Sequence, residues 1–462
     1  MALWGSGVRI SSAPPLLPES EGLSHNPHFR FVSYFPGLSS LSVGCRFWFI
    51  PDPIFSSVFR IYVPLFSLLS GFVVPVDFLI PAFDDLSEST GSGRSVGSVE
   101  PVPCFLLVDG GWGGERLGMK AAVLYGREDI RIESVAERSL DAGEVRVRIG
   151  AALTCGTDLK VYRRGYHARM LTPPCVFGHE LAGTVVEVAP DVAGWIAGDR
   201  VVCANSAPCG TCERCAGGQE NLCDDLLFLN GAYAESIVIP ARIVKKNLLR
   251  LRSETPFEAA ALTEPLACVV QGIQDLQLRP GERVLVMGAG PIGLFAVALA
   301  VEAGCVVTVA GRGESRLSLA RRLGASNIVD MAGREDLEAA VRFSAPAAVF
   351  DAVFEAVGKP TAWEAATRLV RKGGRVNFFG GCPSGTSVTL ETGLLHYSNL
   401  TLLASFHHTP RSIRTALDLI ERGVIRVGDF VDGEASLDEL PELFRSMAQG
   451  NRSVKTRIRM NA

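Results

Sequence analysis

The chain has 462 residues, of which 47% are hydrophobic and 20% are charged, and its formal net charge is -4. This length points to two packed domains rather than one, and the apolar share supplies enough core to exclude a fibrous protein. The slightly acidic balance excludes a general nucleic-acid binder, because such a protein needs a basic face for phosphates. We therefore expect a small-molecule partner and no nucleic acid.

Residues 1–118 are rich in Phe, Ser, Pro and Gly and show neither helical nor alternating periodicity. We interpret this region as disordered, or as a non-native extension that precedes a natural first residue at Met119. The apolar run at 61–76 contains two prolines and is short for a membrane span, so we expect no membrane segment. Its position also argues against a cleaved signal peptide, which would begin near Met1 with a basic segment.

Strand-like patterns begin directly after Lys120. Short β-branched runs separated by Gly or Pro turns, such as 144–149 and 182–188, predict a small β-rich unit. From Gly281 the pattern alternates between strand and helix, which predicts a parallel sheet covered on both faces. The expected strands are 283–287, 306–310, 348–355 and 375–379, and the first expected helix is 292–302. A helix over 412–421 begins a tail that we expect to return to the first unit.

The chain has twelve cysteines, and most of them lie between Cys155 and Cys268 at spacings typical of metal ligands rather than of disulfides. We therefore expect a cytoplasmic protein. The densest group follows the pattern Cys-x2-Cys-x2-Cys-x7-Cys and consists of Cys209, Cys212, Cys215 and Cys223. Four thiolates on one short loop predict a closed, structural zinc site. An iron–sulfur cluster is the competing interpretation, because closely spaced thiolates also suit it.

A second set of candidate metal ligands is spread more widely along the chain. A catalytic zinc takes about three protein ligands and keeps one exchangeable position. Thiolate, imidazole and carboxylate donors are supplied by Cys155, His179, Glu180 and Glu264. Taken singly, each has an ordinary structural explanation, such as a buried small side chain or a helix cap. Together with a cofactor motif downstream, they predict a catalytic zinc site.

Gly288, Gly290 and Gly293 form a Gly-x-Gly-x-x-Gly turn between the expected strand 283–287 and the helix that follows, with Pro291 and Ile292 inside the turn. Glycines here let the backbone approach a pyrophosphate, whose charge is met by the N-terminus of the helix. The motif has its strand and its helix in place, and it therefore predicts a dinucleotide cofactor.

Gly311 and Arg312 occupy the end of the second expected strand, where an acidic residue would hold the ribose 2'-hydroxyl of NAD. The missing carboxylate and the added cation favour a 2'-phosphate, so NADP(H) is slightly preferred over NAD(H). Arg316 is a further cofactor-binding candidate. The alternative is that Arg312 stacks on the adenine or faces solvent.

Taken together, these motifs resemble those of a known protein family. The chain from Met119 onward is similar to the zinc-containing medium-chain dehydrogenase/reductase family, and within it to the polyol (sorbitol) and threonine dehydrogenase branch. The matching segments follow the order and spacing of the family; they are Cys-Gly-Thr-Asp at 155–158, Gly-His-Glu at 178–180, the cysteine loop, Glu-Pro-Leu-Ala at 264–267 and the glycine turn at 288–293.

The resemblance implies an α/β protein in which a GroES-like catalytic domain is interrupted by a Rossmann domain. The implied boundaries are 119–270 and 409–462 for the catalytic domain and 271–408 for the cofactor domain, and the assembly is expected to be a homodimer or homotetramer. It also implies that Cys155 and His179 bind the catalytic zinc, that Glu180 is a ligand or an outer partner, and that Glu264 binds directly or through water. Glu264 replaces a cysteine of plain alcohol dehydrogenases and points to polyols.

The implied reaction is hydride transfer between a secondary alcohol or polyol and NAD(P). Zinc lowers the pKa of the alcohol as a Lewis acid, and Thr157 matches the hydroxyl residue that relays the proton. Lys160 stands where threonine dehydrogenases carry a histidine, which weakens threonine as the substrate and leaves the outer proton route open. A zinc-free double-bond reductase and a non-catalytic cofactor-binding relative are the alternatives, and both metal sets argue against them. We expect ordinary packing or surface roles for His407 and His408.

Overall fold

The computed structural model describes residues 118–167, 169–345, 349–450 and 453–460, all within one compact unit, Pro101–Ala462. The interpretation of 1–118 and of the apolar run at 61–76 therefore falls outside the described residues, apart from Gly118. Within the described ranges, each helix is too short or too polar to cross a membrane.

The β-rich part of the chain is built around a seven-stranded sheet with the order β10-β6-β5-β3-β18-β17, in which β9 also pairs with β3. Neighbouring strands in this sheet are antiparallel, except that β17 and β18 are parallel. The strands are β3 (Val145–Leu153), β5 (Leu181–Val188), β6 (Arg200–Cys203), β9 (Ser236–Ile239), β10 (Leu248–Arg250), β17 (Val431–Ser436) and β18 (Lys455–Arg459).

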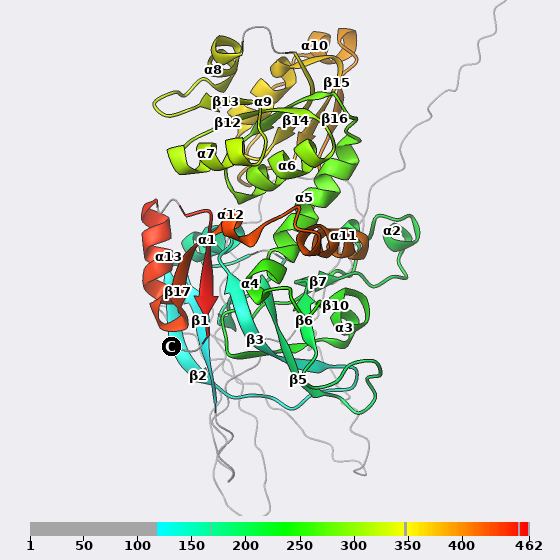
Figure 1. Ribbon diagram of the computed structural model, residues 1–462, viewed down its shortest axis with the longest axis vertical. Helices are drawn as coiled ribbons and strands as arrows, with labels where there is room; N and C mark the ends of the chain where they lie inside the picture. The colour runs from blue at the N-terminus through cyan, green and yellow to red at the C-terminus, as the bar shows by residue number, and fades with distance from the viewer. Residues whose placement is uncertain (1–117, 168, 346–348, 451–452, 461–462) are drawn as a thin grey trace, which may run out of the picture. The chain divides into compact units, whose positions relative to one another are not determined.

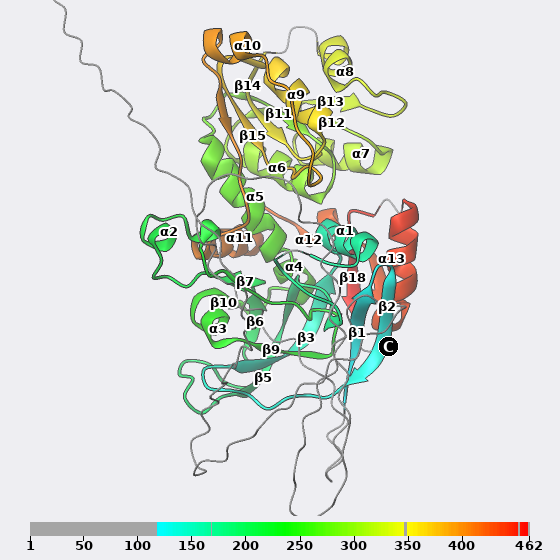
Figure 2. The same cartoon turned by 180° about the vertical axis from the view of Figure 1, so that it is seen from behind.

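Smaller elements surround this sheet (Figures 1 and 2). A three-stranded sheet has the order β2-β1-β4, and a two-stranded sheet pairs β7 with β8. Their bounds are β1 (Met119–Gly126), β2 (Asp129–Val135), β4 (Cys175–Val176), β7 (Ser206–Ala207) and β8 (Leu227–Phe228). The helices are α1 (Gly156–Arg164), α2 (Glu213–Ala216), α3 (Ala241–Asn247), α4 (Phe257–Ala260), α12 (Val427–Phe430) and α13 (Leu440–Gln449).

Strands from the two ends of the described chain meet in the seven-stranded sheet. Strand β18 pairs with β3 through Arg457 opposite Leu153 and Ile458 opposite Ala152. The alternation of the β18 side chains places Ile458 in the core that β3 and β5 share, whereas its neighbours face outward. The tail therefore joins the first sheet, as the sequence led us to expect.

The middle of the chain forms a six-stranded parallel sheet with the order β13-β12-β11-β14-β15-β16 (Figure 1). The strands are β11 (Arg283–Met287), β12 (Val306–Gly311), β13 (Asn327–Asp330), β14 (Phe350–Glu355), β15 (Val370–Phe378) and β16 (Thr401–Leu403). The helices along this stretch are α5 (Thr263–Leu276), α6 (Pro291–Glu302), α7 (Glu314–Arg322), α8 (Leu337–Ser344), α9 (Pro360–Leu369), α10 (Thr392–Tyr397) and α11 (Pro410–Glu421).

Both faces of the parallel sheet are buried. Val284 and Val286 of β11 pack with α5 and α6, whereas Leu285 and Met287 pack with α8 and α9 on the opposite face. Successive strand residues point to opposite faces, so a continuous apolar run such as β11 requires helices on both sides. The predicted class, an α/β protein with a doubly covered parallel sheet beside a β-rich unit, is confirmed.

An aromatic cluster fastens the C-terminal helix α13 to the β-rich unit. The fully buried ring of Phe444 lies 5.6 Å from Tyr162, 5.6 Å from Phe177 and 6.0 Å from Tyr233, measured between ring centroids. Tilted and edge-on aromatic pairs of this kind add to the free energy gained by burial. Helix α13 therefore depends on one side chain for most of its aromatic contacts.

We expect the Phe444→Ala substitution to lower the free energy of unfolding by about 3–5 kcal/mol, because it opens a cavity among three other rings. Urea unfolding followed by tryptophan fluorescence measures the loss. The control is Gln449→Ala at the exposed end of the same helix. A change below about 1 kcal/mol for Phe444→Ala would contradict the assigned packing.

Candidate functional site

Cys155, His179 and Glu180 each offer a metal-binding atom, and these atoms all lie within 4.8 Å of one another. Cys155 is the N-cap of α1, where its Sγ accepts a hydrogen bond from the backbone N–H of Thr157 at 3.4 Å. His179 and Glu180 directly precede β5, and the Leu153 N–H donates to the carbonyl of Glu180 at 3.1 Å. The pairing of β3 with β5 therefore brings the predicted ligands together from two separate segments.

His179 is held by a buried carboxylate. Its Nδ1 lies 2.8 Å from Oδ1 of Asp158, and the Tyr233 hydroxyl donates to Oδ2 of the same carboxylate at 2.7 Å. Burial alone would lower the pKa of His179, but the negative charges of Asp158 and Cys155 outweigh it and raise that pKa well above its usual range. A carboxylate behind the imidazole is the arrangement that orients metal-binding histidines, with Nε2 left for the metal.

Glu180 is fully buried and paired with a buried lysine. The Nζ of Lys455 donates to both carboxylate oxygens of Glu180, at 2.6 and 2.5 Å, and to the carbonyl of Thr154 at 3.0 Å. Burial opposes a charge on Lys455, but the Glu180 carboxylate outweighs it and raises the pKa of the ammonium. Burial also raises the pKa of Glu180, although the Lys455 ammonium acts to lower it, and the 2.5 Å contact pairs the two side chains as ammonium and carboxylate.

Glu264 lies in a neighbouring group of possible ligands, with Cys268 and His407, and not in the group of Cys155. Glu264 and Cys268 are four residues apart on α5, so they share one face of the helix. Burial raises the pKa of Glu264 to about 7, while the charge of His179 acts to lower it. The two groups are thus electrostatically linked, although the structure does not place all four predicted ligands in one cluster.

His407 contributes more to this neighbourhood than ordinary packing. Its Nε2 lies 2.6 Å from Oγ of Ser206, and burial lowers its pKa to about 3. The adjacent His408 is buried, with Nε2 at 2.9 Å from Oδ1 of Asn205 and 3.9 Å from Oε1 of Glu264. Both imidazoles are therefore neutral at physiological pH and available as hydrogen-bonding groups beside Glu264.

The four cysteines of the loop at 209–223 also converge. The Sγ atoms lie 4.0 Å apart for Cys209 and Cys215, 3.5 Å for Cys212 and Cys215, and 3.9 Å for Cys212 and Cys223. All four are free thiols. Tetrahedral zinc with bonds of about 2.3 Å separates its sulfur ligands by roughly 3.8 Å, so this spacing fits a metal and is too long for disulfides.

The glycine turn has the shape that close approach to a pyrophosphate requires. Gly288 has a φ of +107°, and a Cβ on Gly293 would meet the carbonyl oxygen of Gly288 at 1.8 Å. Gly290 is the N-cap of α6, Pro291 is the first residue of that helix, and no side chain caps it. The backbone N–H groups at the start of α6, including that of Ile292, are therefore free to bind a negatively charged group.

Gly311 ends β12 beside the turn, and a Cβ there would meet the Cβ of Ala289 at 2.4 Å. The guanidinium of Arg312 donates to the carbonyls of Met331, at 3.1 Å, and Arg334, at 2.9 Å. Arg316 donates to the carbonyl of Ser453 at 2.7 Å. The structure thus keeps Arg312 beside the turn, whereas Arg316 donates to the segment before β18.

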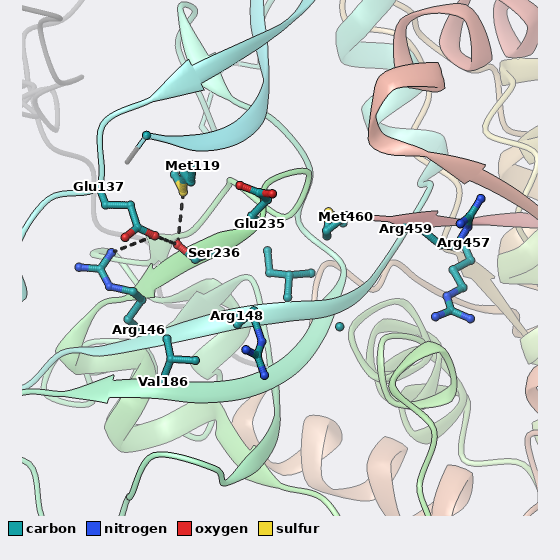
Figure 3. Close-up of a pocket in the computed structure, with 13 residues that line it drawn as sticks. Met119, Glu137, Arg146, Arg148, Val186, Glu235, Ser236, Arg457, Arg459 and Met460 are labelled. Carbon is teal, nitrogen blue, oxygen red and sulfur yellow. Dashed lines mark hydrogen bonds and ion pairs between the residues drawn. The ribbon is translucent and has the colours of Figure 1, made fainter. Parts of the chain in front are cut away.

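A pocket of about 650 Å³ lies elsewhere on the β-rich unit (Figure 3). Arg146 and Arg148 of β3 and Arg457 and Arg459 of β18 line it, and Ser236 donates to Glu137 at its edge. None of the predicted metal or cofactor residues belongs to its lining. The pocket is therefore separate from the metal-donor groups.

Sequence reasoning missed three residues of the site. Asp158 stands inside the Cys-Gly-Thr-Asp motif, so its place three residues after Cys155 was a usable signal. Tyr233 and Lys455 had none, because they reach Asp158 and Glu180 through the packing of distant strands. Among the predicted residues, Thr157 is half-buried in the first turn of α1, and its backbone touches Cys155.

Glu355 is a buried carboxylate at the end of β14, directly opposite Met287 in the register. Its Oε1 accepts hydrogen bonds from the backbone N–H groups of Val357, at 2.7 Å, and Gly358, at 2.9 Å. Burial nevertheless raises its pKa from 4.5 to about 7. The folded chain therefore holds a proton here that the unfolded chain releases at lower pH.

Because the folded pKa is raised, the stability that depends on this proton is present below about pH 4.5 and lost as the pH rises to about 7. Glu355→Gln mimics the protonated form. We expect the substitution to raise the free energy of unfolding at pH 8 by about 2 kcal/mol more than it does at pH 4.5. Denaturant unfolding at both pH values measures this, with the exposed Glu335→Gln as the control. Equal effects at both pH values would contradict the prediction.

Two family models match the chain. The alcohol dehydrogenase GroES-like domain matches residues 141–248, and the zinc-binding dehydrogenase model matches residues 291–422. The GroES-like and Rossmann assignments implied by the sequence are thereby confirmed, because the first match covers the central part of the β-rich unit and the second covers most of the parallel sheet.

Characterised relatives align with the chain over most of their length. The sorbitol dehydrogenase of Bacillus subtilis (strain 168) is 28% identical over 351 residues, which are 74% of this chain and 98% of that protein. The D-altritol 5-dehydrogenase of Agrobacterium fabrum is 36% identical over 314 residues, which are 66% of this chain and 89% of that protein. A crystal structure described as a zinc-binding dehydrogenase of Sinorhizobium meliloti 1021, bound to NADP, is 29% identical with a TM-score of 0.68, covering 74% of this chain and 99% of that chain.

Proposed function

The chain belongs to the zinc-containing medium-chain dehydrogenase/reductase family, and we propose that its reaction takes place at the group formed by Cys155, His179 and Glu180. It is an oxidoreductase that moves hydride between a secondary alcohol or polyol and NAD(P). The observation that carries the site assignment is the convergence of thiol, imidazole and carboxylate within 4.8 Å, with Asp158 behind the imidazole.

This donor set fits a catalytic zinc. Zinc binds thiolate, imidazole and carboxylate, and here all three are present at partly or fully buried positions. Cys155 and His179 would hold the ion, with Glu180 or Glu264 completing the set. A zinc bound there supplies a Lewis acid that lowers the pKa of the substrate hydroxyl, and the nicotinamide accepts the hydride.

The chain's own residues orient the donors and handle the proton. Asp158 orients the ring of His179, because its Oδ1 lies 2.8 Å from Nδ1 and Nε2 is then the ring atom left for the metal. The Tyr233 hydroxyl holds Asp158 from the other side. Thr157 is two residues after Cys155, in the first turn of α1, and its hydroxyl would relay the proton from the substrate oxygen.

The loop with Cys209, Cys212, Cys215 and Cys223 would hold a second, structural zinc. Four thiols within 4.8 Å of one another, with three of the sulfur pairs at 3.5–4.0 Å, match a closed tetrahedral shell with no position for substrate. None of these four cysteines belongs to the group of Cys155. Its metal would therefore stabilise the fold without taking part in the reaction.

Single cysteine substitutions distinguish the roles of the two proposed zinc sites. We expect two zinc ions per chain in the unmodified protein and one in Cys155→Ala. Turnover in Cys155→Ala falls more than about 100-fold, while cofactor binding, measured by fluorescence titration, is kept. Cys212→Ser also loses one zinc but mainly lowers Tm, by roughly 10 °C.

The matched control is Cys305→Ala, a buried cysteine outside both groups, which should keep both zinc ions. Full turnover in Cys155→Ala would remove the site assignment. Stoichiometric iron in place of zinc would overturn the structural zinc.

We also propose that NADP(H) is slightly preferred over NAD(H). Gly311 leaves no acidic side chain at the end of β12, and the close contact with Ala289 excludes one. Arg312 stands next to it with a guanidinium that its two backbone bonds hold in place. A fixed cation without a carboxylate suits a ribose 2'-phosphate.

Arg312→Ala is expected to lower kcat/KM with NADP by about 10-fold or more and to change kcat/KM with NAD little, because hydrogen bonds to a charged phosphate are lost. Steady-state kinetics with both cofactors measures the ratio. Arg321→Ala, at an exposed position in the last turn of the next helix, is the control. An unmodified chain that favours NAD, or an unchanged ratio in Arg312→Ala, would refute the preference.

From the family we also propose that the catalytic domain comprises 119–270 and 409–462, with the cofactor domain at 271–408 between them. The assembly would be a homodimer or homotetramer. Screening polyols and other secondary alcohols against both cofactors would identify the substrate.

A further inference from the structure

Glu355 is a buried carboxylate that the proposed reaction does not use, and it lies where three strands of the parallel sheet end. It is the last residue of β14, which runs between β11 and β15. The Ala356 N–H donates to the carbonyl of Met287, at the end of β11, at 2.8 Å. The Gly380 N–H, just beyond β15, donates to the carbonyl of Glu355 at 2.8 Å. The three strand ends are therefore bonded to one another around one side chain.

The carboxylate itself ties down the loop after β14. Its Oε1 accepts hydrogen bonds from the backbone N–H groups of Val357, at 2.7 Å, and Gly358, at 2.9 Å. Its Oε2 is buried and has no hydrogen-bond partner among the described residues. The Trp363 indole N–H donates to the carbonyl of Gly380 at 2.9 Å and holds the neighbouring loop. A buried oxygen without a partner costs free energy, so its presence at this place calls for a role.

The loops around Glu355 are packed so closely that only glycine fits at their contacts. A Cβ on Gly380 would lie 2.5 Å from the backbone nitrogen of Gly358. Gly358 has a φ of +70°, and a Cβ on it would lie 2.7 Å from the carbonyl oxygen of Gly381. On the other side, a Cβ on Gly288 would lie 3.2 Å from the carbonyl oxygen of Ala356. The loop after β14 is thus wedged between the glycine turn and the loop after β15, and a shift of one moves the others.

The order of the strands places this wedge at one half of a bound dinucleotide. The order β13-β12-β11-β14-β15-β16 reverses at β11, and dinucleotides bind across the carboxyl ends of the strands at such a point. The proposed adenosine contacts, Gly311 and Arg312, lie at the end of β12, on one side of the glycine turn. Strands β14 and β15 lie on the other side, so the nicotinamide half falls over their ends. Backbone without side chains at Gly358 and Gly380 fits a ligand that approaches closely.

We propose that Glu355 is a positioning residue for the nicotinamide half of the cofactor, because it holds the loop at 356–358 in the shape on which that half rests. This inference rests on the proposed function, in that the cofactor is a nicotinamide dinucleotide. An ionised carboxylate accepts stronger hydrogen bonds than a protonated one. The loop is therefore held best when Glu355 is ionised, and the affinity for the nicotinamide half rises with pH.

The surroundings of Glu355 make it the group that titrates here. Burial raises the pKa of Glu355 to about 7. Cys382 faces it from the loop after β15; burial and Glu355 raise the pKa of this thiol above 9.0, although Lys160 of α1 acts to lower it. The thiol therefore stays uncharged near neutral pH. The glycine turn has no ionisable side chain, α9 presents the uncharged Trp363, and Lys359 before α9 is exposed to solvent.

The test compares NADP+ with a ring-free ligand, 2'-phosphoadenosine diphosphoribose, which is the same molecule without its nicotinamide. Both carry the 2'-phosphate and the pyrophosphate, so the ratio of their Kd values isolates the ring. Calorimetry at about pH 5.5 and about pH 8.5 gives this ratio on both sides of the Glu355 pKa. If NAD is the preferred cofactor, NAD+ and ADP-ribose form the corresponding pair.

Four proteins are compared: the unmodified chain, Glu355→Gln, Glu302→Gln and Cys155→Ala. Glu302→Gln is the matched control, because Glu302 is exposed at the C-terminal end of α6. Cys155→Ala removes any contribution of the proposed zinc to the pH dependence and keeps Glu355.

In the unmodified protein we expect the Kd of NADP+, relative to that of the ring-free ligand, to fall about 10-fold from the lower to the higher pH. This is the size of one hydrogen bond to a charged group. In Glu355→Gln the ratio should change less than about 3-fold and stay near the low-pH value of the unmodified protein, because the amide mimics the protonated form. Glu302→Gln and Cys155→Ala should behave as the unmodified protein does.

A ratio that does not change with pH in the unmodified protein would overturn the inference, and so would a pH dependence that persists in Glu355→Gln. A purely structural Glu355 would change Tm and leave the ratio alone. If Glu355→Gln does not fold, Cys155→Ala decides, and a ratio independent of pH in that variant overturns the inference. A protein that shows the expected ratios but oxidises no alcohol would refute the proposed function alone.

Discussion

The pairing of β18 with β3 is the constraint on which the site depends. It joins residues about 300 positions apart in the chain, and through Thr154 and Thr456 it fixes the backbone next to Cys155. The same strand places Lys455 against Glu180, beside His179 at the start of β5. A site assembled from β3, β5 and β18 is as rigid as the sheet, and this rigidity is what a metal site requires of its ligands.

Paired charges make the buried polar groups of the site tolerable. An isolated charge in a protein interior costs more free energy than a fold can supply, so buried charges occur in partnership. Asp158 is matched by His179 and Tyr233, and Glu180 is matched by Lys455. Glu264 lacks a close cation and instead has a pKa of about 7, which is the behaviour of a carboxylate that needs a partner. A zinc ion is a partner of the appropriate charge.

Much of this architecture was predictable from the sequence. Continuous apolar runs such as 283–287 predicted the covered parallel sheet, and cysteine spacing predicted the convergence of the loop at 209–223, because both signals are local. Lys455 and Tyr233 were not predictable, since their partners lie on strands distant in sequence. Glu264 was expected beside Cys155, yet it groups with Cys268 and His407. Residue types predict the chemistry of a ligand set, but only packing decides which donors meet.

The central claim is that the chain holds a mixed-ligand zinc at Cys155 and a separate all-sulfur zinc in the cysteine loop. X-ray absorption at the zinc edge of the purified full chain tests this most directly. We expect zinc–sulfur scattering at about 2.3 Å together with zinc–nitrogen or zinc–oxygen scattering at about 2.0–2.1 Å. In Cys212→Ser, zinc–nitrogen and zinc–oxygen scattering should make up a larger share of the total signal. Sulfur scattering alone, or a chain that carries iron and no zinc, would contradict it.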